Sequence, residues 1–153
     1  FERRRSFLKK IVNFDVNAEH YIVDAVFVWC FDQRFEGLEN GVREYYGFGR
    51  IDPVNVAGGV KDISSGSYYS KKYLLEQIDA SIKLHDAKSV VLMAHVTCGA
   101  YGRTFDTNEK DRTFYCKELE EGERIVSRHL RQKGLAHIRI IKIYADFTGA
   151  FEV

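Results

Sequence analysis

Strand-like and helix-like segments alternate along this chain, and the alternation leaves few folds open to it. Residues Tyr21–Cys30 and Ser89–His95 are short runs rich in apolar and β-branched side chains, which predicts buried strands. Ser67–Leu84 instead carries leucines and isoleucines at helical spacing. Strands that alternate with helices in this way are typical of a parallel sheet with helices on its faces.

The rest of the chain continues this order. Further strands are predicted at Arg50–Val56 and Ala136–Tyr144, and further helices at Gly37–Tyr46 and Thr107–Lys133. Pro53 restricts or bends the strand that contains it. We therefore predict an α/β fold with a four-stranded, mainly parallel sheet flanked by helices.

The start of the chain predicts an amphipathic helix from Phe1 to about Val16, with Phe7, Leu8, Ile11 and Val12 on one side. Basic residues at positions 3–5, 9 and 10 could bind phosphate, but we favour the solvated face of that helix. The sequence contains no repeat or linker that would divide it. We expect residues 1–153 to form a single domain, with residues 1–18 as a helical arm.

Charge and hydropathy exclude several classes of partner. The formal net charge of the 153 residues is +1, which gives no general attraction to nucleic acid. No apolar run approaches the roughly 20 residues of a membrane span. The first ten residues lack the apolar stretch of a signal peptide, and three cysteines favour thiols or metal ligands over disulfides. We expect a cytoplasmic protein without nucleic-acid or membrane partners.

Two short motifs follow two of the predicted strands. The pattern C-x-D-x-R occupies Cys30–Arg34, and H-x-x-C occupies His95–Cys98. In open α/β sheets, ligands bind at the carboxyl ends of the strands, so neighbouring strands would bring the motifs together. Two thiolates and one imidazole suit Zn²⁺, and three protein ligands leave a fourth position for water. Cys116 lies in a predicted helix, where we expect a small buried hydrophobe rather than a ligand.

Asp32 and Arg34 offer acid–base chemistry beside such a metal. A strand end can direct both side chains the same way, and the arginine would hold the carboxylate ionised. A carboxylate beside zinc can accept a hydrogen bond from the metal-bound water and orient it. A D-x-R pattern by itself is more often a surface ion pair, so its position after Cys30 carries this interpretation.

These motifs resemble those of the β-class carbonic anhydrases. The chain looks like a short and divergent member of that family. That family is similar in having C-x-D-x-R, an N-A-G turn, G-H-x-x-C-G and a late Y-D-x-x-T-G stretch. The matching segments here are CFDQR at Cys30–Arg34, NVAGG at Asn55–Gly59, AHVTCGAYG at Ala94–Gly102 and YADFTG at Tyr144–Gly149. They occur in the same order and span most of the chain.

The resemblance implies one zinc ion per chain held by Cys30, His95 and Cys98, with an Asp32–Arg34 dyad as catalytic residues. It implies reversible hydration of CO₂ to bicarbonate by zinc-bound hydroxide. It also implies a homodimer or higher homo-oligomer. In that family the carboxylate of the dyad can leave the arginine, bind zinc and displace the water, which closes the site.

Three glycines are expected to bind substrate: Gly58, Gly59 and Gly99. Backbone N–H groups at Gly58 and Gly59 could hold an anion. An equally good interpretation is a tight turn that requires positive φ. Four histidines could include a proton shuttle or could be ordinary surface residues, namely His20, His85, His129 and His137.

The chain also departs from the family pattern. The turn reads N-V-A-G, Ala94 replaces the glycine before the histidine, and the region after Cys98 looks reduced. These differences affect the shape of the pocket and access of substrate more than they affect metal binding. They leave open a zinc hydrolase of CS₂ or COS, and a non-catalytic zinc-binding protein of the same fold. A redox protein that uses Cys98 and Cys116 is a weaker alternative, because the chain has no C-x-x-C motif.

Overall fold

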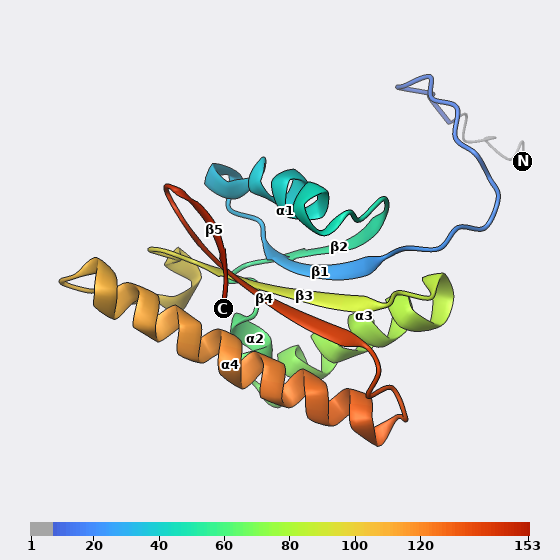
Figure 1. Ribbon diagram of the computed structural model, residues 1–153. Helices are drawn as coiled ribbons and strands as arrows, with labels where there is room; N and C mark the ends of the chain where they lie inside the picture. The colour runs from blue at the N-terminus through green and yellow to red at the C-terminus, as the bar shows by residue number, and fades with distance from the viewer. Residues whose placement is uncertain (1–7) are drawn as a thin grey trace, which may run out of the picture.

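The computed structural model describes residues 8–153, which contain a five-stranded sheet with helices on both faces (Figure 1). The spatial order of the strands is β2-β1-β3-β4-β5. The strands are β1 Ala25–Cys30, β2 Ile51–Val56, β3 Ser89–His95, β4 Arg139–Asp146 and β5 Gly149–Glu152. The helices are α1 Leu38–Tyr46, α2 Lys61–Ser64, α3 Tyr68–His85 and α4 Asn108–Gln132. Helix α1 covers one face, while α2, α3 and α4 cover the other (Figure 1).

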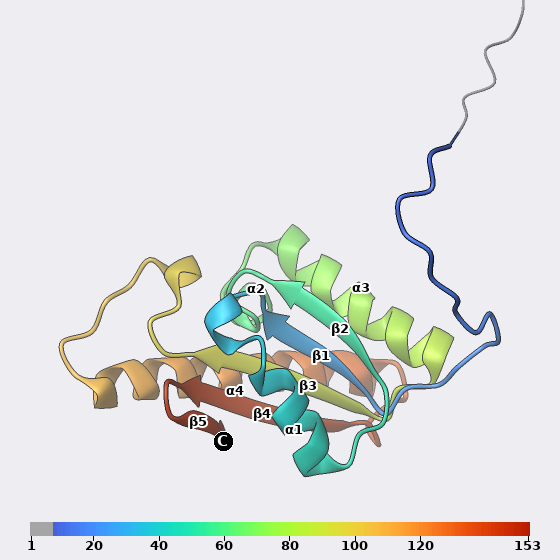
Figure 2. The same ribbon diagram turned by 90° about the horizontal axis from the view of Figure 1, so that it is seen from above.

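Strands β1 and β3 form the centre of the sheet. Every residue in both is buried, as their uninterrupted apolar composition predicts for strands covered on two faces. They pair directly and in parallel, with Ala25 opposite Ser89 and Val28 opposite Leu92. Strands β1 to β4 all run the same way, so their carboxyl ends lie at one edge of the sheet (Figure 2).

Strand β2 lies at the edge of the sheet and contains Pro53 opposite Phe27. An edge strand accepts proline because one side of its backbone has no ladder partner. At the other edge, β5 pairs antiparallel with β4, with Asp146 opposite Gly149. The mainly parallel sheet is confirmed, but it has five strands rather than the predicted four. Strand β5 has four residues, which is too short to show an alternating pattern in the sequence.

The predicted N-terminal helix is wrong for residues 8–18, which contain neither helix nor strand. The first seven residues of that prediction lie outside the described residues. Figure 2 shows this segment leading away from the sheet, and its apolar side chains are exposed, with Leu8 97% and Ile11 86% accessible. An amphipathic helix in water depends on an apolar surface to pack against, and this segment has none here. Among the described residues, no helix is both long and apolar enough to cross a membrane.

Helix α4 approaches α2 closely at Gly122. A methyl group added there would overlap the Val60 side chain, so glycine is required by packing rather than by backbone angles. Gly41 in α1 provides a contrast, because an added methyl group there meets nothing within 4 Å.

We expect Gly122→Ala to lower the free energy of unfolding by about 1–2 kcal/mol, since the added methyl group overpacks the contact with Val60. Gly41→Ala should raise the free energy of unfolding by about 0.5–1 kcal/mol, because alanine favours helix. Denaturant unfolding of both variants checks this. Equal effects would contradict the close α2–α4 contact.

Candidate metal centre

The two sequence motifs meet where the central strands β1 and β3 end, at the carboxyl ends of the parallel strands. Cys30 is the last residue of β1, His95 is the last residue of β3, and Cys98 follows three residues later. One ligand atom from each residue lies within 4.8 Å of the other two, and all three residues are buried. Within residues 8–153 no other group of histidine, cysteine and carboxylate side chains has this geometry. Cys116, in α4, is not part of the group, and it is partly buried rather than fully buried as predicted.

The orientation of His95 suits a metal ligand. Its Nδ1 lies 2.8 Å from the carbonyl oxygen of Val96, which assigns the ring proton to Nδ1. Its Nε2 is buried and has no hydrogen-bond partner in the described part of the chain. Phe35 packs against the imidazole, with ring centroids 4.5 Å apart. The free lone pair of Nε2 would be satisfied by a metal ion, with the carbonyl group of Val96 fixing the tautomer.

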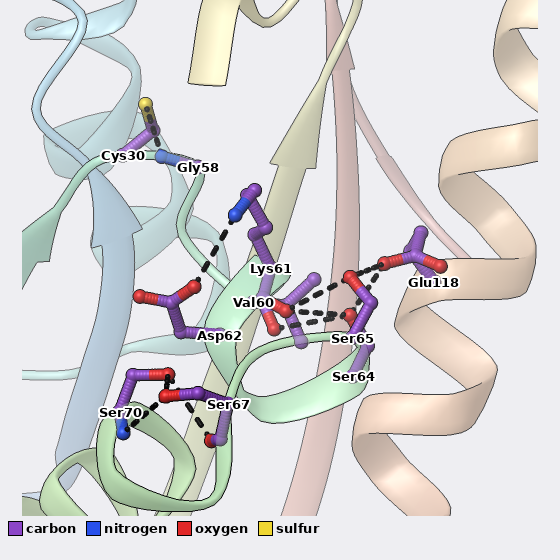
Figure 3. A network of polar contacts seen from close by, with 10 residues as sticks. All are labelled: Cys30, Gly58, Val60, Lys61, Asp62, Ser64, Ser65, Ser67, Ser70 and Glu118. Carbon is purple, nitrogen blue, oxygen red and sulfur yellow. Dashed lines mark hydrogen bonds and ion pairs between the residues drawn. The ribbon is translucent and has the colours of Figure 1, made fainter. Parts of the chain in front are cut away.

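The two thiols are coupled to each other. A hydrogen bond from the Cys98 thiol is the main reason that the pKa of Cys30 falls to about 4, although burial opposes the change. The same bond raises the pKa of Cys98, and burial raises it further. The backbone N–H of Gly58 also donates to the Cys30 sulfur at 3.4 Å (Figure 3). The pair therefore favours the thiolate form of Cys30, which is the form in which cysteine binds a metal ion.

Two residues of α4 hold the loop that carries Cys98. The N–H of Thr97 donates to Asp111 Oδ2 at 3.2 Å, and the N–H of Cys98 donates to the Tyr115 hydroxyl at 3.1 Å. The hydroxyl of Tyr144 donates to the other oxygen of Asp111 at 3.2 Å. Thr97 has a φ of 50°, a strained value for a β-branched residue, and these bonds help to keep it there.

Asp111 and Tyr115 were not among the residues predicted from the sequence. Both are buried, and they lie four residues apart on one face of α4. The available signal was an aspartate four residues before a tyrosine in a predicted helix, but the sequence could not show their burial or which loop the pair contacts.

The Gly58–Gly59 turn has positive φ values of 83° and 57°. A side chain at Gly59 would overlap the carbonyl oxygen of Met93, so the turn also needs close backbone approach. The N–H of Gly58 is directed at the Cys30 sulfur, and that of Gly59 at the carbonyl of Val56 at 3.3 Å. Both donors therefore have partners within the chain. Gly99 is exposed, with nothing within 4 Å of the place where a side chain would begin.

Helix α2 follows this turn directly and is bound to α4. The hydroxyls of Ser64 and Ser65 both donate to Glu118 Oε2, at 2.5 and 2.9 Å (Figure 3). This contact fixes the far end of the segment whose first residues contact Cys30. The position of the Gly58 N–H therefore depends on α4 as well.

Asp32 and Arg34 form a multiply bonded ion pair beside the three candidate ligands. Arg34 donates from Nη2 to Oδ2 at 2.5 Å and from Nε to Oδ1 at 3.0 Å. These bonds are the main reason that the pKa of Asp32 falls to about 2. Oδ2 of Asp32 also lies 3.8 Å from Nε2 of His95, so an ionised carboxylate borders the centre. A hollow of about 170 Å³, lined partly by Trp29, Cys30 and Asp32, opens next to it.

Two of the four histidines outside the motif are bound to aspartates. His85 Nδ1 lies 2.7 Å from Asp52 Oδ2, and His129 Nε2 lies 2.8 Å from Asp79 Oδ1. Asp52 is near the start of β2, at the opposite end of the sheet from Cys30. These contacts favour an ordinary structural role for both histidines over the role of a proton shuttle.

The fold is that of the β-class carbonic anhydrases. The β-carbonic anhydrase isoform I of Trichomonas vaginalis superposes with a TM-score of 0.57 at 16% identity, over 92% of this chain and 87% of that one. A carbonic anhydrase from Streptococcus mutans gives 0.53 at 18% identity, over 88% and 83%. One from Glaciozyma antarctica gives 0.54 at 13% identity, over 87% and 83%.

The family itself is established by sequence. A family model described as "Putative carbonic anhydrase" matches residues 22–153, and the chain belongs to this family. No curated protein sequence matches the chain. The resemblance inferred from the motifs is therefore confirmed at the level of family and fold.

We expect Tyr115→Phe to lower the free energy of unfolding by about 1–3 kcal/mol, because the buried N–H of Cys98 loses its acceptor. Tyr73→Phe is the matched control, since that side chain is exposed. Urea unfolding of both variants measures the difference. Equal stability of the two variants would contradict a supporting role for Tyr115.

Proposed function

We propose that this protein is a zinc-dependent carbonic anhydrase that interconverts CO₂ and bicarbonate. One observation carries the proposal: a buried Cys-His-Cys group lies beside an ionised, arginine-bound carboxylate at the carboxyl edge of the sheet. Three ligands of this type are the donor set of a catalytic zinc site, with a fourth position left for water. Membership of the carbonic anhydrase family supports the same reaction.

The residues divide the chemistry between them. Cys30, His95 and Cys98 would hold zinc, which when bound lowers the pKa of a coordinated water and so supplies a nucleophile near neutral pH. Asp32 would accept a hydrogen bond from that water at Oδ2, the oxygen that faces His95 Nε2. Arg34 keeps the carboxylate ionised and fixes its direction through paired hydrogen bonds.

The pairing of Asp32 with Arg34 supports a water-accessible form of the site. A carboxylate held by arginine is not available as a fourth metal ligand, so that position remains for solvent. The hollow of about 170 Å³ beside Cys30 and Asp32 is large enough for a triatomic substrate. We therefore place CO₂ in this hollow during the reaction.

Exposed apolar side chains support a proposal about assembly, and the two buried thiols support one about location. We propose a homodimer or higher homo-oligomer, supported by the exposed apolar side chains of the segment before β1, among them Leu8, Phe14 and Ile22. We propose a reducing, cytoplasmic setting, because two neighbouring free thiols at Cys30 and Cys98 would otherwise be prone to form a disulfide. The whole chain would then act as one zinc-binding domain.

We expect Cys30→Ser, His95→Ala and Cys98→Ser each to lose bound zinc, since each removes one of three candidate ligands. Cys116→Ser is the matched control and should keep one zinc per chain, because its sulfur lies outside the group. Elemental analysis of the purified variants measures occupancy. Full zinc occupancy in any of the first three would refute the ligand assignment.

We expect Asp32→Ala to retain zinc and to lower the rate of CO₂ hydration by about 10²-fold or more, the scale of a lost general base. Stopped-flow hydration assays, run beside assays of sulfide release from CS₂ and COS, test both reaction and substrate. An undiminished hydration rate would remove Asp32 from the mechanism. Sulfide release without CO₂ hydration by the unaltered protein would overturn the proposed substrate.

A further inference from the structure

An exposed aromatic ring contacts Arg34 of the Asp32–Arg34 pair. Phe147 lies in the turn between β4 and β5, and 64% of it is accessible to solvent. The guanidinium carbon of Arg34 lies 5.5 Å from the centroid of its ring. Asp32 thus belongs to the segment after β1, whereas Phe147 belongs to the β4–β5 hairpin, two strands away in the sheet.

A second ring completes the contact. Phe35, which is buried, stacks on Phe147 with centroids 5.7 Å apart and an interplanar angle of 18°. The guanidinium carbon of Arg34 is 5.9 Å from the Phe35 centroid as well. Phe35 also packs on His95, so an aromatic column runs from the candidate metal ligand to the surface, with Arg34 beside its outer half.

Arg34 needs this contact because its ion pair is open to water. Its side chain is 50% accessible, and exposed ion pairs add little stability because solvent competes for both charges. When a guanidinium group also packs on aromatic rings, water displaces fewer of its contacts, and fewer side-chain rotamers are open to it. Without the outer ring, only its bonds to Asp32 and the contact with Phe35 would restrain it.

The turn itself fixes the place of the ring. Oδ1 of Asp146 accepts hydrogen bonds from the backbone N–H of Thr148 at 2.7 Å, from its hydroxyl at 2.6 Å and from the N–H of Gly149 at 3.2 Å. Phe147 lies inside this bonded turn and is exposed, so apart from its contact with Phe35 it lies outside the buried core. An apolar ring carried by a hydrogen-bonded turn and placed against the guanidinium of a charged pair points to a role in that pair.

We propose that Phe147 is a positioning residue that keeps Arg34 bound to Asp32 and so prevents the Asp32 carboxylate from taking the fourth position of the metal centre. This rests on the proposed zinc site. Oδ2 of Asp32 already lies 3.8 Å from Nε2 of His95, so a carboxylate released from Arg34 would be close to the ion that His95 would bind. A contact of this kind shifts such an equilibrium by about two- to five-fold.

The test compares Phe147→Ala, Phe147→Leu and Phe147→Tyr with a matched control, Phe151→Ala. Phe151 belongs to the same hairpin and lies 5.7 Å from the guanidinium of Arg112, so its loss removes a similar contact away from the site. Thiocyanate binding to the cobalt-substituted proteins, followed by visible absorption, reports access to the fourth position. We expect binding to weaken in the alanine and leucine variants, by at most about five-fold because apparent affinity falls only as the open fraction falls, and to stay unchanged in the tyrosine variant and the control.

Two further measurements separate this proposal from its alternatives. In an Asp32→Ala background, Phe147→Ala should no longer weaken thiocyanate binding, because the competing carboxylate is gone. A persistent effect would mean that the ring contacts the anion itself and would overturn the proposal. So would thiocyanate affinity in Phe147→Leu equal to that of the unaltered protein.

The contact can also be measured without metal. Side-chain ¹⁵N NMR of the metal-free protein should show faster rotation of the Arg34 guanidinium in Phe147→Ala than in Phe151→Ala. Equal rotation rates would overturn the proposed restraint. If the unaltered protein fails to bind cobalt at all, the proposed metal centre fails, while the NMR comparison still decides whether Phe147 restrains Arg34.

Discussion

The direct parallel pairing of β1 with β3 is the contact on which the rest of the structure depends. It aligns two strands that are buried along their whole length, and it brings their carboxyl ends to the same place. Cys30 and His95 occupy those ends, so the burial that stabilises the sheet also brings the proposed ligands together. The site needs little further organisation from the strands, because the register already determines where both side chains begin.

Organisation beyond the strand ends comes from α4 and from the hairpin. Asp111 and Tyr115 hold the loop of Cys98 from one side, and Glu118 fixes α2 behind the Gly58 turn. Phe147 approaches from the other side and contacts Arg34. The ligands therefore belong to regular strands and a short loop, while the groups around them come from segments more distant in the sequence. This arrangement is typical of sites in which supporting contacts set ligand orientation.

The sequence predicted what depends on local pattern. The alternation of segments located β1 to β4 and the longer helices, and the motif spacing identified the residues that meet at the sheet edge. Prediction from sequence failed where the structure depends on a distant partner. Residues 8–18 have helical periodicity but no surface to pack against. Strand β5 forms only because β4 offers an edge with which it can pair. Tyr115 and Phe147 were missed for the same reason, since each acts on a residue far away in the chain.

The positions of the three candidate ligands along the chain have a mechanical consequence. A cation shared by Cys30, His95 and Cys98 would cross-link the first strand to a point far beyond the middle of the sequence, with α1, β2, α2 and α3 in the loop between them. Closing a long loop in this way lowers the conformational entropy of the unfolded chain more than a local bridge does. The ion would then act as a staple for the whole sheet, and the supply of metal would limit how much of the chain reaches its folded form.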